Sequence, residues 1–159
     1  MAKLLITYYS RTGNTRQMAE LIAETARGVE GVEVTCQPIE QIEPGDMVHA
    51  DGVVIGSPVY YGTMAAEVKQ FFDASVVHHG KLEGKVGGAF ASAGGPGGGA
   101  ETTVLDIVKG LIIHGMIVQG DPKGDHYGPT AVGAPDERSA KECARFGKRT
   151  AELVKRLFG

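Results

Sequence analysis

Short apolar runs alternate with longer segments of helical apolar spacing, and this alternation is the feature that most constrains the fold. The apolar runs are residues 3–9, 32–36, 53–55, 86–92 and 116–118. Each has the length of a strand, and the continuous runs are typical of strands buried on both faces. In the second run Glu33 and Thr35 alternate with apolar residues, which favours an edge strand.

The segments between the runs predict helices. Over residues 14–28, Met18, Leu21 and Ile22 share one apolar stripe. A further helix follows the third run and is expected to contain Met64, Val68, Phe71 and Phe72. Another follows the fourth run, and the last covers about residues 135–158 with Asp136 as its N-cap.

Parallel strands need crossover connections, and helices usually supply them. The order of elements therefore predicts a doubly wound α/β fold in three layers, with a parallel sheet covered by helices on both faces. The length of 159 residues suits a single domain, so we expect one domain over residues 1–159.

Composition narrows the function. The net charge of −3 gives no basic surface for nucleic acid or an anionic membrane. Cys36 and Cys143 are far apart and match no zinc-ligand spacing, so we expect neither a disulfide framework nor a metal site. No apolar run reaches the length of a membrane span, and we expect a cytoplasmic protein that acts on small molecules.

The first loop follows the first strand and opens the first helix. It contains Ser10, Arg11, Thr12, Gly13, Asn14 and Thr15. Hydroxyl groups and free backbone amides at a helix N-terminus favour a phosphate, and the loop lacks the Gly-Lys-Ser/Thr sequence of a triphosphate site. It therefore predicts binding of one phosphate group, although a simple hydroxyl-rich helix cap would have the same composition.

Two more loops follow the third and fourth strands. The second carries Val59, Tyr60 and Tyr61, whose aromatic and apolar surface could stack on a flat ring. The third is the glycine run of residues 94–99, whose amides could approach a ligand closely. Its match to G-x-G-x-x-A, with Asp121 downstream, leaves dinucleotide binding as an alternative.

Together these loops resemble the flavodoxin superfamily, in particular the WrbA-type NAD(P)H:quinone oxidoreductases. The resemblance covers residues 10–15, 56–64 and 92–99, and also His114-Gly115-Met116 and residues 127–130. It implies a flavodoxin-like fold with a five-stranded parallel sheet in the order 2-1-3-4-5, bound FMN, and a homo-oligomer, either a dimer or a tetramer. The FMN contacts that it implies are Ser10, Arg11, Thr12, Gly13, Asn14, Thr15, Pro58, Val59, Tyr60, Tyr61, Gly62, Ser92, Ala93, Gly94, Gly95, Gly97 and Gly98.

His114 matches a histidine that approaches the flavin in that family, and it is the candidate catalytic residue. Residues 57–66 and 92–100 contain no Asp or Glu, whereas a one-electron flavodoxin surrounds its flavin with acidic groups. The sequence thus favours two-electron transfer from NAD(P)H to a quinone. A one-electron carrier and a non-catalytic FMN-binding regulatory module are the alternatives.

Overall fold

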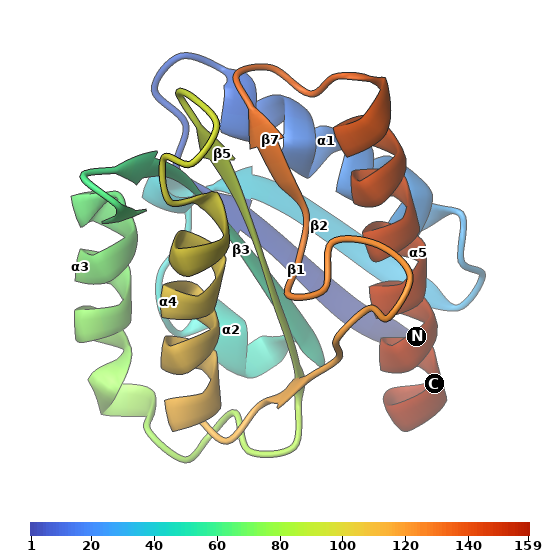
Figure 1. The fold of residues 1–159 in the computed structure, drawn as a ribbon. Coiled ribbons are helices and arrows are strands. Elements are labelled where there is room, and N and C mark those ends of the chain that lie inside the picture. The colour runs from blue at the N-terminus through green and yellow to red at the C-terminus, as the bar shows by residue number, and fades with distance from the viewer.

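The computed structural model describes residues 1–159 and contains one sheet between two layers of helices (Figure 1). The sheet has the order β2-β1-β3-β5-β6, and all of these strands pair in parallel. Their bounds are β1 (Ala2–Tyr8), β2 (Val32–Pro38), β3 (Gly52–Tyr60), β5 (Val86–Ala93) and β6 (Ile117–Val118). The doubly wound fold is confirmed, and β2 is an edge strand as its alternating sequence predicts.

Helices cover both faces of the sheet. In Figure 1, α1 (Asn14–Arg27) and α5 (Glu137–Phe158) lie on one side, and α3 (Ala66–Ala74) and α4 (Ala100–Ile113) lie on the other. The short helix α2 (Asp46–His49) and two 3₁₀ turns complete the helical segments. Each face buries its own apolar cluster, because every long helix turns one apolar stripe to the sheet. No helix has both the length and the apolar content that a membrane span requires.

The expectation of five strands is wrong in number, because the sheet contains seven. Strand β4 (Thr63–Met64) pairs antiparallel with the end of β3. Met64 therefore lies in a hairpin and not in the helix that was expected to contain it, and α3 begins only at Ala66. Strand β7 (Thr130–Val132) pairs in parallel with the carboxyl end of β5, while β6 pairs with its amino end. The order 2-1-3-4-5 holds for the main path when β4 and β7 are left out.

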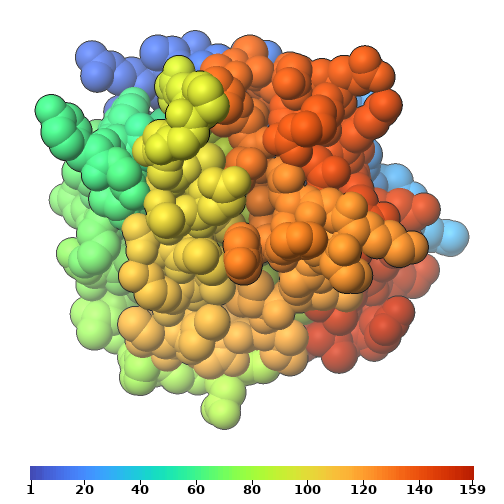
Figure 2. Space-filling model, in the orientation of Figure 1, coloured from blue at the N-terminus to red at the C-terminus, as the bar shows by residue number.

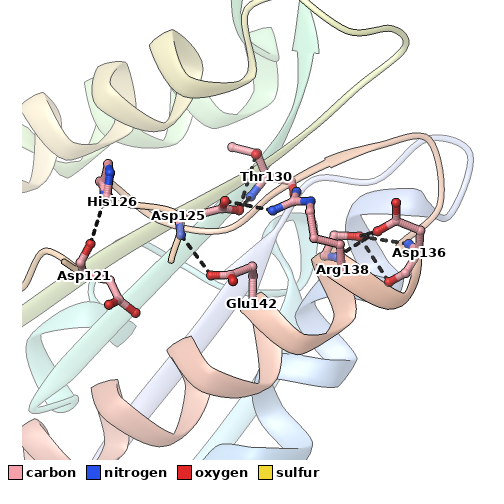
Figure 3. A network of polar contacts seen from close by, with 8 residues as sticks. Asp121, Asp125, His126, Thr130, Asp136, Arg138 and Glu142 are labelled. Carbon is pink, nitrogen blue, oxygen red and sulfur yellow. Dashed lines mark hydrogen bonds and ion pairs between the residues drawn. The ribbon is translucent and has the colours of Figure 1, made fainter. Parts of the chain in front are cut away.

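The two-part fifth strand arises because a polar segment, residues 119–129, interrupts it. Side chains of α5 hold this segment in place (Figure 3). The carboxylate of Asp125 accepts hydrogen bonds from Thr130 N and from Arg138, each 2.9 Å long, and Asp125 N donates to Glu142. At the start of α5, Asp136 caps the helix as predicted, since Ser139 N donates to its side chain.

Asp121 makes the shortest polar contact of this segment. Its nearly buried carboxylate lies 2.6 Å from Arg145 Nε and 3.1 Å from Arg149 Nη1. The hydrogen bond from Arg145 holds the pKa of Asp121 well below its usual value, and the backbone amide of Lys123 and the charge of Arg149 act in the same direction. The segment is therefore fixed to α5 as long as Asp121 is ionised.

We expect Asp121→Asn to lower the free energy of unfolding by about 2 kcal/mol at neutral pH, because it removes charged hydrogen bonds. A depressed pKa stabilises the fold above the ordinary carboxyl value, so the difference from wild type should shrink as the pH falls below about 4. Urea unfolding at several pH values measures this. Glu137→Gln is the control, since its exposed pair with Lys141 should contribute less than about 1 kcal/mol. Equal losses in the two variants would contradict the account.

Candidate cofactor site

The carboxyl ends of β1, β3 and β5 lie level with one another. Tyr8 of β1 pairs with Gly56 of β3, and Pro58 of β3 pairs with Ser92 of β5. The loops that follow these strands consequently leave the sheet at the same edge, at the top of Figure 1. The space-filling view shows the first loop in blue and the glycine run in yellow projecting from this end (Figure 2). Ligands of open parallel sheets bind at this edge.

The first loop forms a cradle of free amides, here called the phosphate cradle (residues 10–15). Gly13 has φ 101°, a left-handed conformation that turns the chain into α1. Ser10 Oγ accepts hydrogen bonds from the amides of Gly13 and Arg16, both 3.2 Å long. The amides of Thr12, Asn14 and Thr15 have no acceptor within the chain. Free amides at a helix N-terminus are the donors that a phosphate requires, so the cradle fits the phosphate of FMN.

The second loop is a tight hairpin rather than an irregular loop. Strand β3 continues through Pro58 and Val59 to Tyr60 and returns as β4, with Tyr60 paired to Thr63. The two turn residues, Tyr61 and Gly62, have φ values of 49° and 80°. Positive φ at both central residues is what a two-residue type I′ hairpin turn requires. Tyr61 is fully exposed at the tip, which leaves its ring free to contact a ligand.

Tyr60, the last residue of β3, contacts Tyr9, which follows β1. Its ring centre is 6.4 Å from that of Tyr9, in an edge-to-face arrangement. Burial, together with the nearby charge of Glu67, raises the pKa of Tyr9. The phenol of Tyr9 thus stays neutral.

The third loop, the glycine run of residues 94–99, packs against the hairpin tip. Gly99 has φ 110°, and a Cβ at this position would lie 3.1 Å from Gly62 Cα. The amides of Gly94, Gly95 and Gly97 have no acceptor in the chain. They are therefore free donors for the polar edge of a flat ring.

Two contacts brace the hairpin and were not expected from the sequence. Thr63 Oγ1 donates to Asp106 of α4 at 2.6 Å, and Ala65 N donates to Ser57 Oγ at 2.8 Å. Hydrogen bonds from Lys109 and Thr63 lower the pKa of Asp106. Gly62, a glycine directly after two tyrosines, is the signal that could have indicated a turn in the sequence.

The structure thus brings together the residues of the three loops. These are Ser10, Arg11, Thr12, Gly13, Asn14, Thr15, Pro58, Val59, Tyr60, Tyr61, Gly62, Ser92, Ala93, Gly94, Gly95, Gly97 and Gly98. Arg11 is the one charged residue among them, and its positive sign suits a phosphate.

His114 does not join these residues within the chain. It caps the far end of α4, and the next residue, Gly115, accepts a hydrogen bond from Gly84, just before β5 begins. The imidazole is buried, with Nε2 2.7 Å from Ser75 Oγ, and burial and the nearby histidines lower its pKa. His114 therefore lies at the amino end of the sheet, opposite the three loops.

The dinucleotide alternative required Asp121 as a free acceptor for a ribose. Asp121 is instead occupied by Arg145 and Arg149. No group of three or more His, Cys, Asp or Glu side chains is arranged to hold a metal ion. The geometry therefore favours the three loops as one cofactor site.

Comparison with known proteins agrees with this geometry. Residues 5–94 match the Flavodoxin domain family. A flavodoxin of Aquifex aeolicus is 41% identical to the chain over 97% of this chain and 88% of its own length. An NAD(P)H dehydrogenase (quinone) of Archaeoglobus fulgidus is 31% identical over 99% of this chain and its full length. A flavodoxin, WrbA-like protein from Agrobacterium tumefaciens superposes with a TM-score of 0.83 at 24% identity, covering 98% of this chain and 99% of its own, which shows the shared fold.

The chain is a member of the flavodoxin family. Its similarity to a quinone dehydrogenase over the whole chain supports the resemblance to the WrbA-type branch. Membership in this family implies FMN as the cofactor.

We expect Thr12→Val to weaken FMN binding about tenfold or more, because Thr12 is exposed on the phosphate cradle and a hydrogen bond to a charged phosphate contributes roughly 1.5 to 3 kcal/mol. Riboflavin lacks the phosphate, so its affinity should not change. Quenching of flavin fluorescence on titration with the protein measures both affinities. An equal loss for both ligands would remove Thr12 from the phosphate contacts.

Proposed function

We propose that the protein is an FMN-dependent oxidoreductase that transfers two electrons from NAD(P)H to a quinone. The overall reaction is NAD(P)H + H⁺ + quinone → NAD(P)⁺ + hydroquinone. Bound FMN would supply the redox chemistry by accepting a hydride equivalent and passing on two electrons. The chain itself would bind the phosphate, orient the ring and leave one face open to the substrates.

The observation that supports two-electron chemistry is that the two loops expected beside the ring carry no acidic side chain. The hairpin and the glycine run contain no Asp or Glu. Asp106 does reach the hairpin, but Thr63 and Lys109 engage its carboxylate, the latter at 2.7 Å. Free amides of the glycine run would stabilise negative charge on the pyrimidine edge of a reduced flavin, so full reduction is electrostatically favourable here.

The hairpin tip also suits small, flat substrates. Tyr60 is partly exposed and Tyr61 is fully exposed, so both could contact a ring that docks beside the flavin. Stacking on aromatic and apolar surface favours nicotinamide and quinone rings alike. Two substrates that use the same open face would bind one after the other.

A one-electron carrier is the second candidate. It is favoured by the Aquifex aeolicus relative, which is named a flavodoxin and has 41% identity to the chain. The two candidates differ in what reduces them, because a carrier needs a separate reductase.

We expect the FMN-loaded protein, mixed anaerobically with NADH or NADPH, to lose its oxidised-flavin absorbance within seconds. Added benzoquinone should restore the absorbance, with one quinone consumed per NAD(P)H oxidised. Stopped-flow absorbance follows both steps. If the absorbance persists with both nucleotides and falls only when a flavodoxin reductase is added, the protein is a carrier and the proposal is wrong.

We also propose that the protein forms a homo-oligomer through the groove between α3 and α4. Val76 and Ile113 line this groove with about two-thirds of their surface exposed (67% and 69%). Exposed aliphatic side chains in one groove are typical of interaction surfaces. His114 also lines the groove, so a role of His114 at a flavin would require a flavin of another subunit.

Val76→Asp and Ile113→Asp should shift the protein to monomer, because each places a charge in an apolar contact. Light scattering after size-exclusion chromatography measures the mass. Leu157→Asp is the control, since Leu157 is exposed at the end of α5 and should not affect assembly. A wild-type protein that is already a monomer at micromolar concentration would contradict the proposal.

A further inference from the structure

A pair of buried hydroxyl groups joins the phosphate cradle to the start of the glycine run. Thr15 Oγ1 and Ser92 Oγ lie 2.7 Å apart, and the two residues are 1% and 5% exposed. Thr15 is in the first turn of α1, and Ser92 is near the carboxyl end of β5. This is the side-chain hydrogen bond that the structure records between the two loops.

The two ends of this contact differ in how firmly the backbone is held. Ser92 sits inside the sheet, paired with Pro58 of β3 on one side and Ala131 of β7 on the other. Thr15 belongs to a helix terminus at which the amides of Asn14 and Thr15 have no acceptor in the chain. The sheet therefore provides a fixed point, and the hydroxyl pair links the first turn of α1 to it.

Thr12 and Thr15 are consequently not equivalent, although both are threonines of the same cradle. Thr12 is exposed, and its hydroxyl has no recorded partner, so it is free to bind a phosphate. Thr15 is buried and already bonded to Ser92. One hydroxyl of the pair donates and the other accepts, which leaves one O–H of the pair for a further acceptor.

We propose that Ser92 is a positioning residue for the flavin, acting through Thr15 to set the separation between the phosphate cradle and the glycine run. This inference rests on the flavin site proposed above. FMN joins its phosphate to its ring by a flexible chain, so both ends are bound tightly only when the two loops are already correctly spaced. The hydroxyl pair would provide this spacing before the cofactor binds.

The experiment compares FMN with riboflavin in titrations of the cofactor-free protein, followed by flavin fluorescence. Ser92→Ala and Thr15→Val should each weaken FMN binding about tenfold, which corresponds to roughly 1.4 kcal/mol. Riboflavin has no phosphate to be spaced from its ring, so its affinity should change little. The double variant should bind FMN no more weakly than either single variant, since both changes remove the same contact. Thr15→Ser keeps the hydroxyl and should restore FMN binding. Thr12→Val is the matched control, because its loss of FMN affinity should add to that of Ser92→Ala.

A second measurement separates positioning from a general loss of structure. The midpoint potential of the bound flavin should become more negative in Ser92→Ala and Thr15→Val, because a displaced phosphate would move the ring away from the free amides of the glycine run. Thr12→Val should leave the potential unchanged. If Ser92→Ala fails to fold in urea-unfolding controls, Thr15→Val and Thr15→Ser provide the same comparison.

Three results would overturn the inference. Unchanged affinity of Ser92→Ala for FMN would show that Ser92 has no positioning role. A loss in Thr15→Val that adds to that of Ser92→Ala would make Thr15 an ordinary phosphate ligand. An unchanged potential in both variants would show that the ring is held independently of the pair. A wild-type protein that binds neither flavin would contradict the proposed function itself, which is a different outcome from any of these.

Discussion

The parallel pairing of β1, β3 and β5 sets the level at which three loops leave the sheet, and the site depends on that register. Tyr8 lies beside Gly56, and Pro58 lies beside Ser92. A shift of one residue in any strand would exchange its side chains between the two helix-covered faces and disrupt both apolar clusters, so the same packing that stabilises the core fixes the site. Stability and ligand geometry are thus coupled through the sheet register.

The polar groups at this edge follow a different rule from those in the rest of the molecule. Elsewhere, the polar segment of residues 119–129 is tied down by Asp121, Asp125 and the arginines of α5. At the open edge, by contrast, three backbone amides of the phosphate cradle (Thr12, Asn14 and Thr15) and three of the glycine run (Gly94, Gly95 and Gly97) have no acceptor in the chain. Free donors concentrated at one edge are what a ligand with a phosphate and a polar ring edge can satisfy.

Much of the fold and of the site could be predicted from the sequence. Continuous apolar runs and helical stripes identify strands and helices reliably when they are long, as for β1, β5 and α1. The hairpin β3–β4 was missed because Met64 is apolar and lies at helical spacing from Val68, while β4 has only two residues. The divided fifth strand was missed because β7 has only three residues. Its pairing depends on contacts with α5, such as that between Arg138 and Asp125, which lie 13 positions apart in sequence.

The candidate site likewise contains some features that a local sequence pattern predicts and others that it does not. Ser10 and Gly13 belong to a local motif, so the role of their loop could be predicted from neighbouring residues. The contact between Thr15 and Ser92 joins positions that lie 77 residues apart, and no local pattern indicates it. His114 was assigned through a family resemblance, and the topology places it at the opposite end of the sheet from the three loops.

Hydrogen exchange of backbone amides with and without FMN, read by mass spectrometry, tests the central claim most directly. The account predicts slower exchange on adding FMN in peptides that cover residues 10–15, 57–62 and 92–99, with little change at the opposite end of the sheet. Protection confined to other segments, or no protection with saturating FMN, would contradict the convergence of these three loops on one cofactor.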